Sequence, residues 1–169
     1  LDFFLRDNIE ENMSLEAITE CDPETLTFGA HGSSKEVYFY MDPDSIRSVE
    51  KVSPNTLKIV HNGCMNDFSN GDTFILRHYV YGGSIFSIGN ESRDLTFDRV
   101  NVFGSSGVAY YFTGGSSHFR ITNGYIGNNP SRSDGDRCSL GADAIHIVNT
   151  NGHFLIENCD ISGMGDDAV

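Results

Sequence analysis

Three aspartates near the end of the chain have the residue type and spacing for acid–base chemistry. Asp143 and Asp167 are 24 residues apart, and Asp166 immediately precedes Asp167. If the chain repeats every 24 residues, Asp143 and Asp167 occupy equivalent positions on neighbouring strands, about 4.8 Å apart. Carboxyl groups this close raise the pKa of at least one of them. A protonated carboxyl beside an ionised one is what glycoside hydrolysis uses.

Two other interpretations of these aspartates stay open at this point. A calcium site would need further oxygen ligands, for which Asp136 and Asp160 are candidates. A solvated turn would need nothing more. We adopt the acid–base interpretation and expect no metal ion.

A repeat of the required period is present in residues 81–169. Two apolar positions recur at a spacing of 24 residues and then of 35, and removal of an 11-residue loop at 129–139 restores 24. The recurring pairs are Leu95 and Phe97, Phe119 and Ile121, and Phe154 and Ile156. Each repeat holds short alternating segments separated by turns rich in Gly, Asn and Ser. A unit this small buries its apolar face only by stacking on its neighbours.

This period predicts the fold class, which is all-β. Two or three short strands per 24 residues are typical of a right-handed parallel β-helix, whereas a propeller needs about 40 or more residues per unit. Residues 1–80 lack the repeat and have hairpin-like punctuation, so we expect a separate antiparallel β insert or small barrel there. An imperfect apolar stripe over 7–21 allows one short helix in that part.

Composition excludes several classes of protein. The 169 residues carry a formal net charge of −13, which disfavours nucleic acid as a partner because phosphate binding needs clustered Lys and Arg. No apolar run is long enough to span a membrane. The four cysteines have no CxxC spacing, so we expect free thiols rather than a zinc site.

The residues around the aspartates resemble glycoside hydrolase family 110, whose members are inverting exo-α-galactosidases acting on α-1,3-linked galactose. The segments that carry the resemblance are GADAIH at 141–146, GHFLIENC at 152–159 and GMGDDAV at 163–169. The segment GDTFILRH at 71–78 is also similar to that family, in which a small β-barrel insert precedes the catalytic coils. Residues 70–169 carry the resemblance, and residues 1–70 share only its general character. The paired aspartates resemble polygalacturonases of family 28 more distantly.

The resemblance implies that Asp143, Asp166 and Asp167 supply the general acid and base of an inverting hydrolysis, without a cofactor. It also brings in His146 and Arg137 as substrate contacts. The residues alone leave an ordinary exposed histidine open for His146, and a loop salt bridge with Asp134 or Asp136 open for Arg137. Tyr111 alternates outward between core positions, where it either stacks on a sugar or is simply exposed.

Two further expectations come from this family. Its members are usually exported, so we expect an extracellular or periplasmic location, although no signal peptide is visible. Its members also continue past the paired aspartates, so we expect this chain to be a fragment of a longer enzyme with little or no activity alone. The alternatives are a polysaccharide-binding β-helix without catalysis, as in tailspikes or adhesins, and a polygalacturonase-like hydrolase. Few Lys and Arg residues disfavour a polyanionic substrate.

Overall fold

The structure is a computed structural model, which describes residues 2–4, 15–25, 27–28, 35–78, 80–131 and 138–169. The described chain is all-β, with a single 3-10 turn, η2 (Pro43–Ser45), as its helical element. It divides into two compact units. The first unit comprises 1–23 and 29–78, and the second comprises 24–28 and 79–169. Residues 24–28, which the sequence analysis placed in the first part, thus belong to the second unit.

The first unit contains two antiparallel sheets of three strands. Their orders are β1-β5-β4 and β3-β2-β6. The strands are β1 (Asp2–Phe4), β2 (Ala17–Glu20), β3 (Glu36–Tyr38), β4 (Ile46–Ser53), β5 (Thr56–His61) and β6 (Phe74–Arg77). Ile18 of β2 and the β5 residues Leu57 and Ile59 belong to one buried cluster, so both sheets of this unit share a core.

The first unit has the antiparallel strands expected for it, but neither a closed barrel among its described residues nor a helix over Ala17–Glu20. The sheets do not close into a barrel in the described residues, because each has two edge strands without a second partner: β1 and β4 in one sheet, β3 and β6 in the other. Ala17–Glu20, in the stretch whose apolar stripe allowed a short helix, forms strand β2 instead. This strand pairs on both sides and buries Ile18 completely, so tertiary pairing overrides the weak helical stripe. The rest of that stripe, at 7–14, lies outside the described residues.

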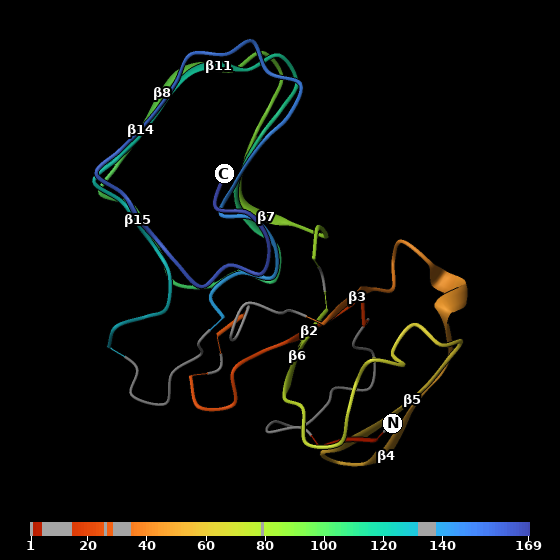
Figure 1. The fold of residues 1–169 in the computed structure, drawn as a ribbon. Helices are drawn as coiled ribbons and strands as arrows, with labels where there is room; N and C mark the ends of the chain where they lie inside the picture. The colour runs from red at the N-terminus through yellow and green to blue at the C-terminus, as the bar shows by residue number, and fades with distance from the viewer. Residues whose placement is uncertain (1, 5–14, 26, 29–34, 79, 132–137) are drawn as a thin grey trace. The chain divides into compact units, whose positions relative to one another are not determined.

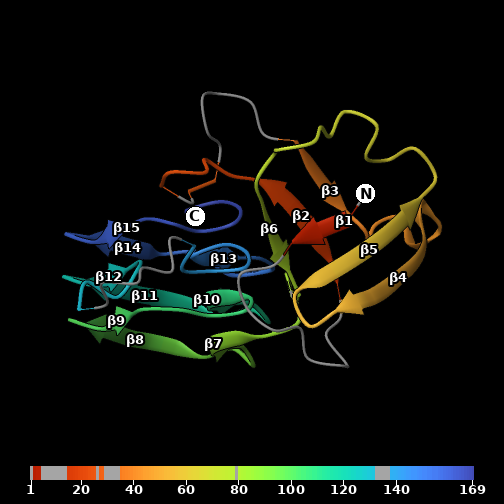
Figure 2. The same cartoon turned by 90° about the horizontal axis from the view of Figure 1, so that it is seen from below.

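The second unit is built from parallel strands that stack in three passes (Figures 1 and 2). Its three sheets have the orders β13-β10-β7, β14-β11-β8 and β15-β12-β9, so each pass contributes one strand to each sheet. In Figure 1 the passes follow nearly the same outline. The strands are β7 (Ser84–Ile88), β8 (Arg93–Asp98), β9 (Asn101–Val102), β10 (Val108–Phe112), β11 (Ser117–Thr122), β12 (Tyr125–Ile126), β13 (Ile145–Ile147), β14 (Phe154–Glu157) and β15 (Asp160–Ile161).

Strand pairing confirms the predicted repeat. Tyr110 pairs with Phe86 on one side and with Ile145 on the other, at spacings of 24 and 35 residues. Phe119 pairs in the same way with Leu95 and Phe154. The extra 11 residues between the second and third passes are therefore absorbed outside the strands, and the core positions remain aligned.

Two of the turns between these strands also repeat, and so does a position near the start of β8, β11 and β14. Residues with positive φ recur at the same 24- and 35-residue spacings, which places them at equivalent positions of the three passes. These ladders are Asn90, Gly114 and Asn149; Asp94, His118 and His153; and Arg99, Asn123 and Asn158. Asn, Asp and Gly tolerate this left-handed conformation best, which explains why the turns are rich in Asn and Gly.

Aromatic side chains form much of the core of the second unit. Tyr110 is completely buried and stacks on Phe86, with ring centroids 4.8 Å apart, and Phe112 packs on Phe119 at 4.4 Å. The Tyr110 hydroxyl has no hydrogen-bond partner among the described residues. Burial raises the pKa of Tyr110 to about 12, and the neighbouring Cys159 adds a smaller effect in the same direction. These rings are core residues, as the repeat predicts.

Cysteines and helices complete the description of the fold. All four cysteines are free thiols, as expected. Cys159 packs against the aromatic core but is only partly buried. Within the described residues, no helix has the length and apolar character needed to cross a membrane.

Candidate active site

Asp143 lies just before β13, at the position expected from the repeat. The Ala144 amide donates to the Asp167 carbonyl at 3.0 Å, and the Ile145 amide donates to the Ala168 carbonyl at 3.2 Å. These bonds continue the parallel pairing and place Asp167 at the position equivalent to Asp143 on the next pass. The side chain of Asp143 is nevertheless only 7% exposed. Such burial is unusual for an aspartate without a partner.

His146 is the partner that compensates this burial. Its Nδ1 atom hydrogen-bonds the Asp143 carboxylate at Oδ2, and the two residues are three positions apart in the chain. The backbone amide of Asp167 donates to the other carboxylate oxygen, Oδ1, at 3.3 Å. Both oxygens of Asp143 are thus occupied by groups of the protein.

Aromatic rings enclose His146 on two sides. Tyr111, its strand neighbour on β10, stacks on the imidazole with centroids 5.4 Å apart and planes 30° apart. Tyr81 meets the same ring edge to face at 5.9 Å. Tyr111 is half-buried, so it is not the freely exposed side chain that alternation allowed. The structure therefore brings together Asp143, His146 and Tyr111 of the predicted site.

Tyr81 is a site residue that the sequence analysis missed. Its hydroxyl donates a 2.6 Å hydrogen bond to Oδ2 of Asp166, which is 85 residues away in the chain. This bond links Asp166 to the His146 cluster through the Tyr81 ring. In the sequence, this position is marked by a tyrosine followed by two glycines, just before the first repeating strand.

A pocket of about 450 Å³ opens beside these rings. Its lining is Tyr81, Gly82, Gly83, Ser84, Val108, Tyr111 and His146. Among the described residues of the lining there is no Lys or Arg, and carboxylates adjoin the pocket through hydrogen bonds to Tyr81 and His146. Aromatic faces together with hydrogen-bond acceptors suit a small uncharged ligand that carries hydroxyl groups.

The remaining predicted residues fall into different positions. Asp166 and Asp167 are both exposed, and only the backbone of Asp167 contacts Asp143 in the bonds described above. Within the part of the chain that the structure describes, no three His, Cys, Asp or Glu side chains are arranged to hold a metal ion. Arg137 lies outside the described residues, as do Asp134 and Asp136.

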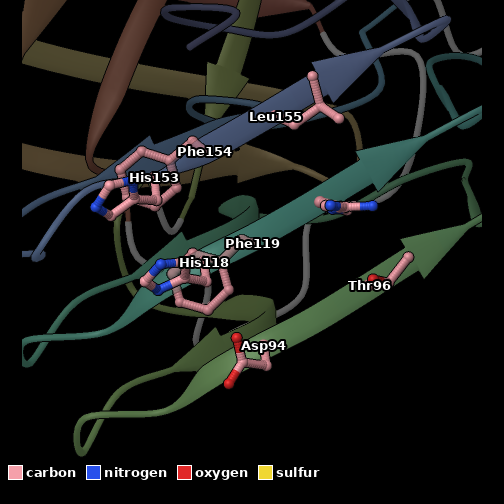
Figure 3. A pocket seen from close by; sticks show the side chains of 8 residues that line it. Asp94, Thr96, His118, Phe119, His153, Phe154 and Leu155 are labelled. Atoms are coloured by element: carbon pink, nitrogen blue, oxygen red, sulfur yellow. The ribbon is translucent and has the colours of Figure 1, made fainter.

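A second depression, of about 530 Å³, lies on the sheet β14-β11-β8 (Figure 3). His118 of β11 and His153, directly before β14, stack with centroids 4.4 Å apart and planes 13° apart. Asp94 precedes them in the same ladder, as Figure 3 shows, and Arg120 also lines the depression. All four of these side chains are exposed. We call this surface the histidine groove.

Comparisons with known proteins add no family to this description. A scan against models of known protein families finds no match. A search of curated protein sequences finds no similar protein either.

Proposed function

We propose that the chain is part of a glycoside hydrolase that removes terminal α-1,3-linked galactose with inversion, and that its second unit is a stretch of right-handed parallel β-helix. The fold proposal is supported by three parallel sheets that share one repeat. The galactoside specificity and the inverting outcome come from the resemblance of the aspartate motifs to glycoside hydrolase family 110.

One observation carries the hydrolase proposal. Asp166 and the Asp143–His146 pair adjoin the same pocket, where Tyr81 and Tyr111 supply aromatic walls. Hydrolysis of a glycoside needs one group that protonates the leaving oxygen and one that activates water. Carboxyl groups beside a pocket that accommodates a hydroxyl-bearing ring match this requirement. In the proposed reaction, one of Asp143, Asp166 and Asp167 acts as the acid and another as the base.

The test uses the natural gene product that contains these residues. Asp143→Asn, Asp166→Asn and Asp167→Asn should each lower kcat/KM for an α-1,3-galactoside by about 10²–10⁴-fold. Asp160→Asn is the matched control, because Asp160 is an exposed aspartate on β15 and is not part of the pocket. Circular dichroism checks that each variant folds. Full activity of all three site variants would refute the assignment. Release of β-galactose as the first product of the unmodified enzyme would support inversion.

The histidine groove favours a second candidate function, which is binding of a polysaccharide without cleavage. Its exposed Arg120, His118, His153 and Thr96 offer hydrogen bonds across three neighbouring strands. In that case, Arg120→Ala should weaken retention of the chain in polysaccharide affinity gels, while Asp166→Asn should leave retention unchanged. Loss of binding with Asp166→Asn and not with Arg120→Ala would instead point to the pocket.

A further inference from the structure

The contacts of Asp143 differ from those of a group that works directly on a substrate. Its side chain is 7% exposed, and its two oxygens accept bonds from His146 Nδ1 and from the Asp167 amide. Asp143 is not among the residues that line the pocket, whereas His146 is. A ligand in the pocket therefore meets the imidazole before it meets the carboxylate.

The bond to Asp143 determines which nitrogen of His146 carries the proton. An ionised carboxylate only accepts hydrogen bonds, so Nδ1 must be the donor. In a neutral imidazole the other nitrogen, Nε2, is then an acceptor. The His146 side chain is 34% exposed and is held between Tyr111 and Tyr81, which limits its rotation.

We propose that Asp143 is a positioning residue, and that Nε2 of His146 is the acceptor that receives a hydroxyl group of the sugar in the pocket. The identity of the sugar rests on the proposed function, whereas the arrangement of the two residues does not. Within that function, the exposed carboxylates Asp166 and Asp167 keep the proton-transfer roles. A uronate is disfavoured as ligand, because its carboxylate would meet no Lys or Arg among the described residues of the lining.

The test is a long-range ¹H–¹⁵N correlation spectrum of the labelled 169-residue chain, recorded at a pH where histidines are neutral. His146 should be protonated on Nδ1 and bare on Nε2. His61 is the internal control with the opposite tautomer, because its Nδ1 accepts the amides of Gly63 and Met65 at 3.1 and 3.4 Å. A proton on Nε2 of His146 in the wild-type chain would overturn the proposal.

Asp143→Asn provides the second arm. The asparagine amide can donate to Nδ1, so the variant should move the His146 proton to Nε2 while His61 stays unchanged. An unchanged His146 tautomer in the folded variant would also overturn the positioning role. If Asp143→Asn does not fold, the wild-type tautomer still decides the matter.

Methyl α-D-galactopyranoside is the probe for the sugar contact. Its addition should shift the Nε2 resonance of His146, and Asp143→Asn should weaken its binding at least about tenfold, the loss of one good hydrogen bond. Binding that leaves Nε2 unshifted would overturn the acceptor role. Absence of binding with the predicted tautomer intact would instead count against the galactoside specificity of the proposed function.

Discussion

The pocket and the histidine groove lie on different sheets of the same second unit, and they use the repeat in different ways. In the groove, the ladder Asp94, His118 and His153 presents exposed side chains, of which the two histidines stack on one another. At the pocket, the ladder formed by Ser84, Val108 and Asp143 changes from a small or apolar residue to a charged one.

What separates the two surfaces is burial and hydrogen bonding. Asp143 is buried and bonded at both oxygens, and Tyr81, which precedes the first of the repeating strands, joins the cluster. A set of equivalent residues thus forms an enclosed site only where its charged member is buried and where residues of other segments contact it. The comparison can be tested at three levels.

The largest effect should come from the close stacking that both surfaces need. A side chain on Gly141 would overlap the backbone carbonyl oxygen of Ser106 on the previous pass. Because backbone atoms cannot move away as a flexible side chain can, Gly141→Ala should lower the free energy of unfolding by about 3 kcal/mol or more, or prevent folding. Gly83→Ala is the control, since nothing lies within 4 Å of its added carbon. Equal urea midpoints for the two variants would contradict the stacking.

An intermediate effect should appear at alkaline pH, in the core beneath both surfaces. The pKa of Tyr110 is raised from 10.0 to about 12, so the unfolded chain loses this proton at lower pH than the native chain. The contribution of Tyr110 to the free energy of unfolding should therefore be fully present below pH 10. This free energy should fall by on the order of 2–3 kcal/mol as the pH rises toward 12.

The variant Tyr110→Phe isolates this contribution. It removes a buried hydroxyl without a described partner, so it should be neutral or slightly stabilising at pH 7 and should flatten the alkaline loss. Tyr111→Phe serves as the control, because its ring is half-buried on the pocket side. Urea unfolding at several pH values measures both. An alkaline loss that is equally steep in Tyr110→Phe would show that another group causes it.

The smallest effects should separate the two surfaces directly. Asp143→Asn weakens a buried charged hydrogen bond and should lower the free energy of unfolding by about 1–2 kcal/mol. His153→Asn in the groove should change it by less than about 0.5 kcal/mol, because the side chain is exposed and Asn tolerates the positive φ of 65°. Denaturant titrations measure the free energy of unfolding of both variants. An equal loss in the two would contradict the distinction between the enclosed Asp143 site and the exposed histidine groove.

Much of the second unit could be predicted from the sequence, because its information is local and periodic. Phe86, Tyr110 and Ile145 recur at the 24- and 35-residue spacings of the repeat, and the strand pairing follows those spacings. The first unit has no repeat to follow. There the strand Ala17–Glu20 exists because two distant strands pair with it, which a local apolar stripe does not reveal.

The candidate site shows the same division. The 24-residue spacing of Asp143 and Asp167 was enough to place them on adjacent passes, since stacked parallel strands impose one register on all their residues. The burial of Asp143, its bond to His146 and the contact of Tyr81 with Asp166 depend on how side chains separated by up to 85 residues pack. Sequence by itself therefore determined which residues are equivalent along the stack. Only the tertiary structure decided which of them are enclosed, because burial and hydrogen bonding depend on neighbours that no local pattern encodes.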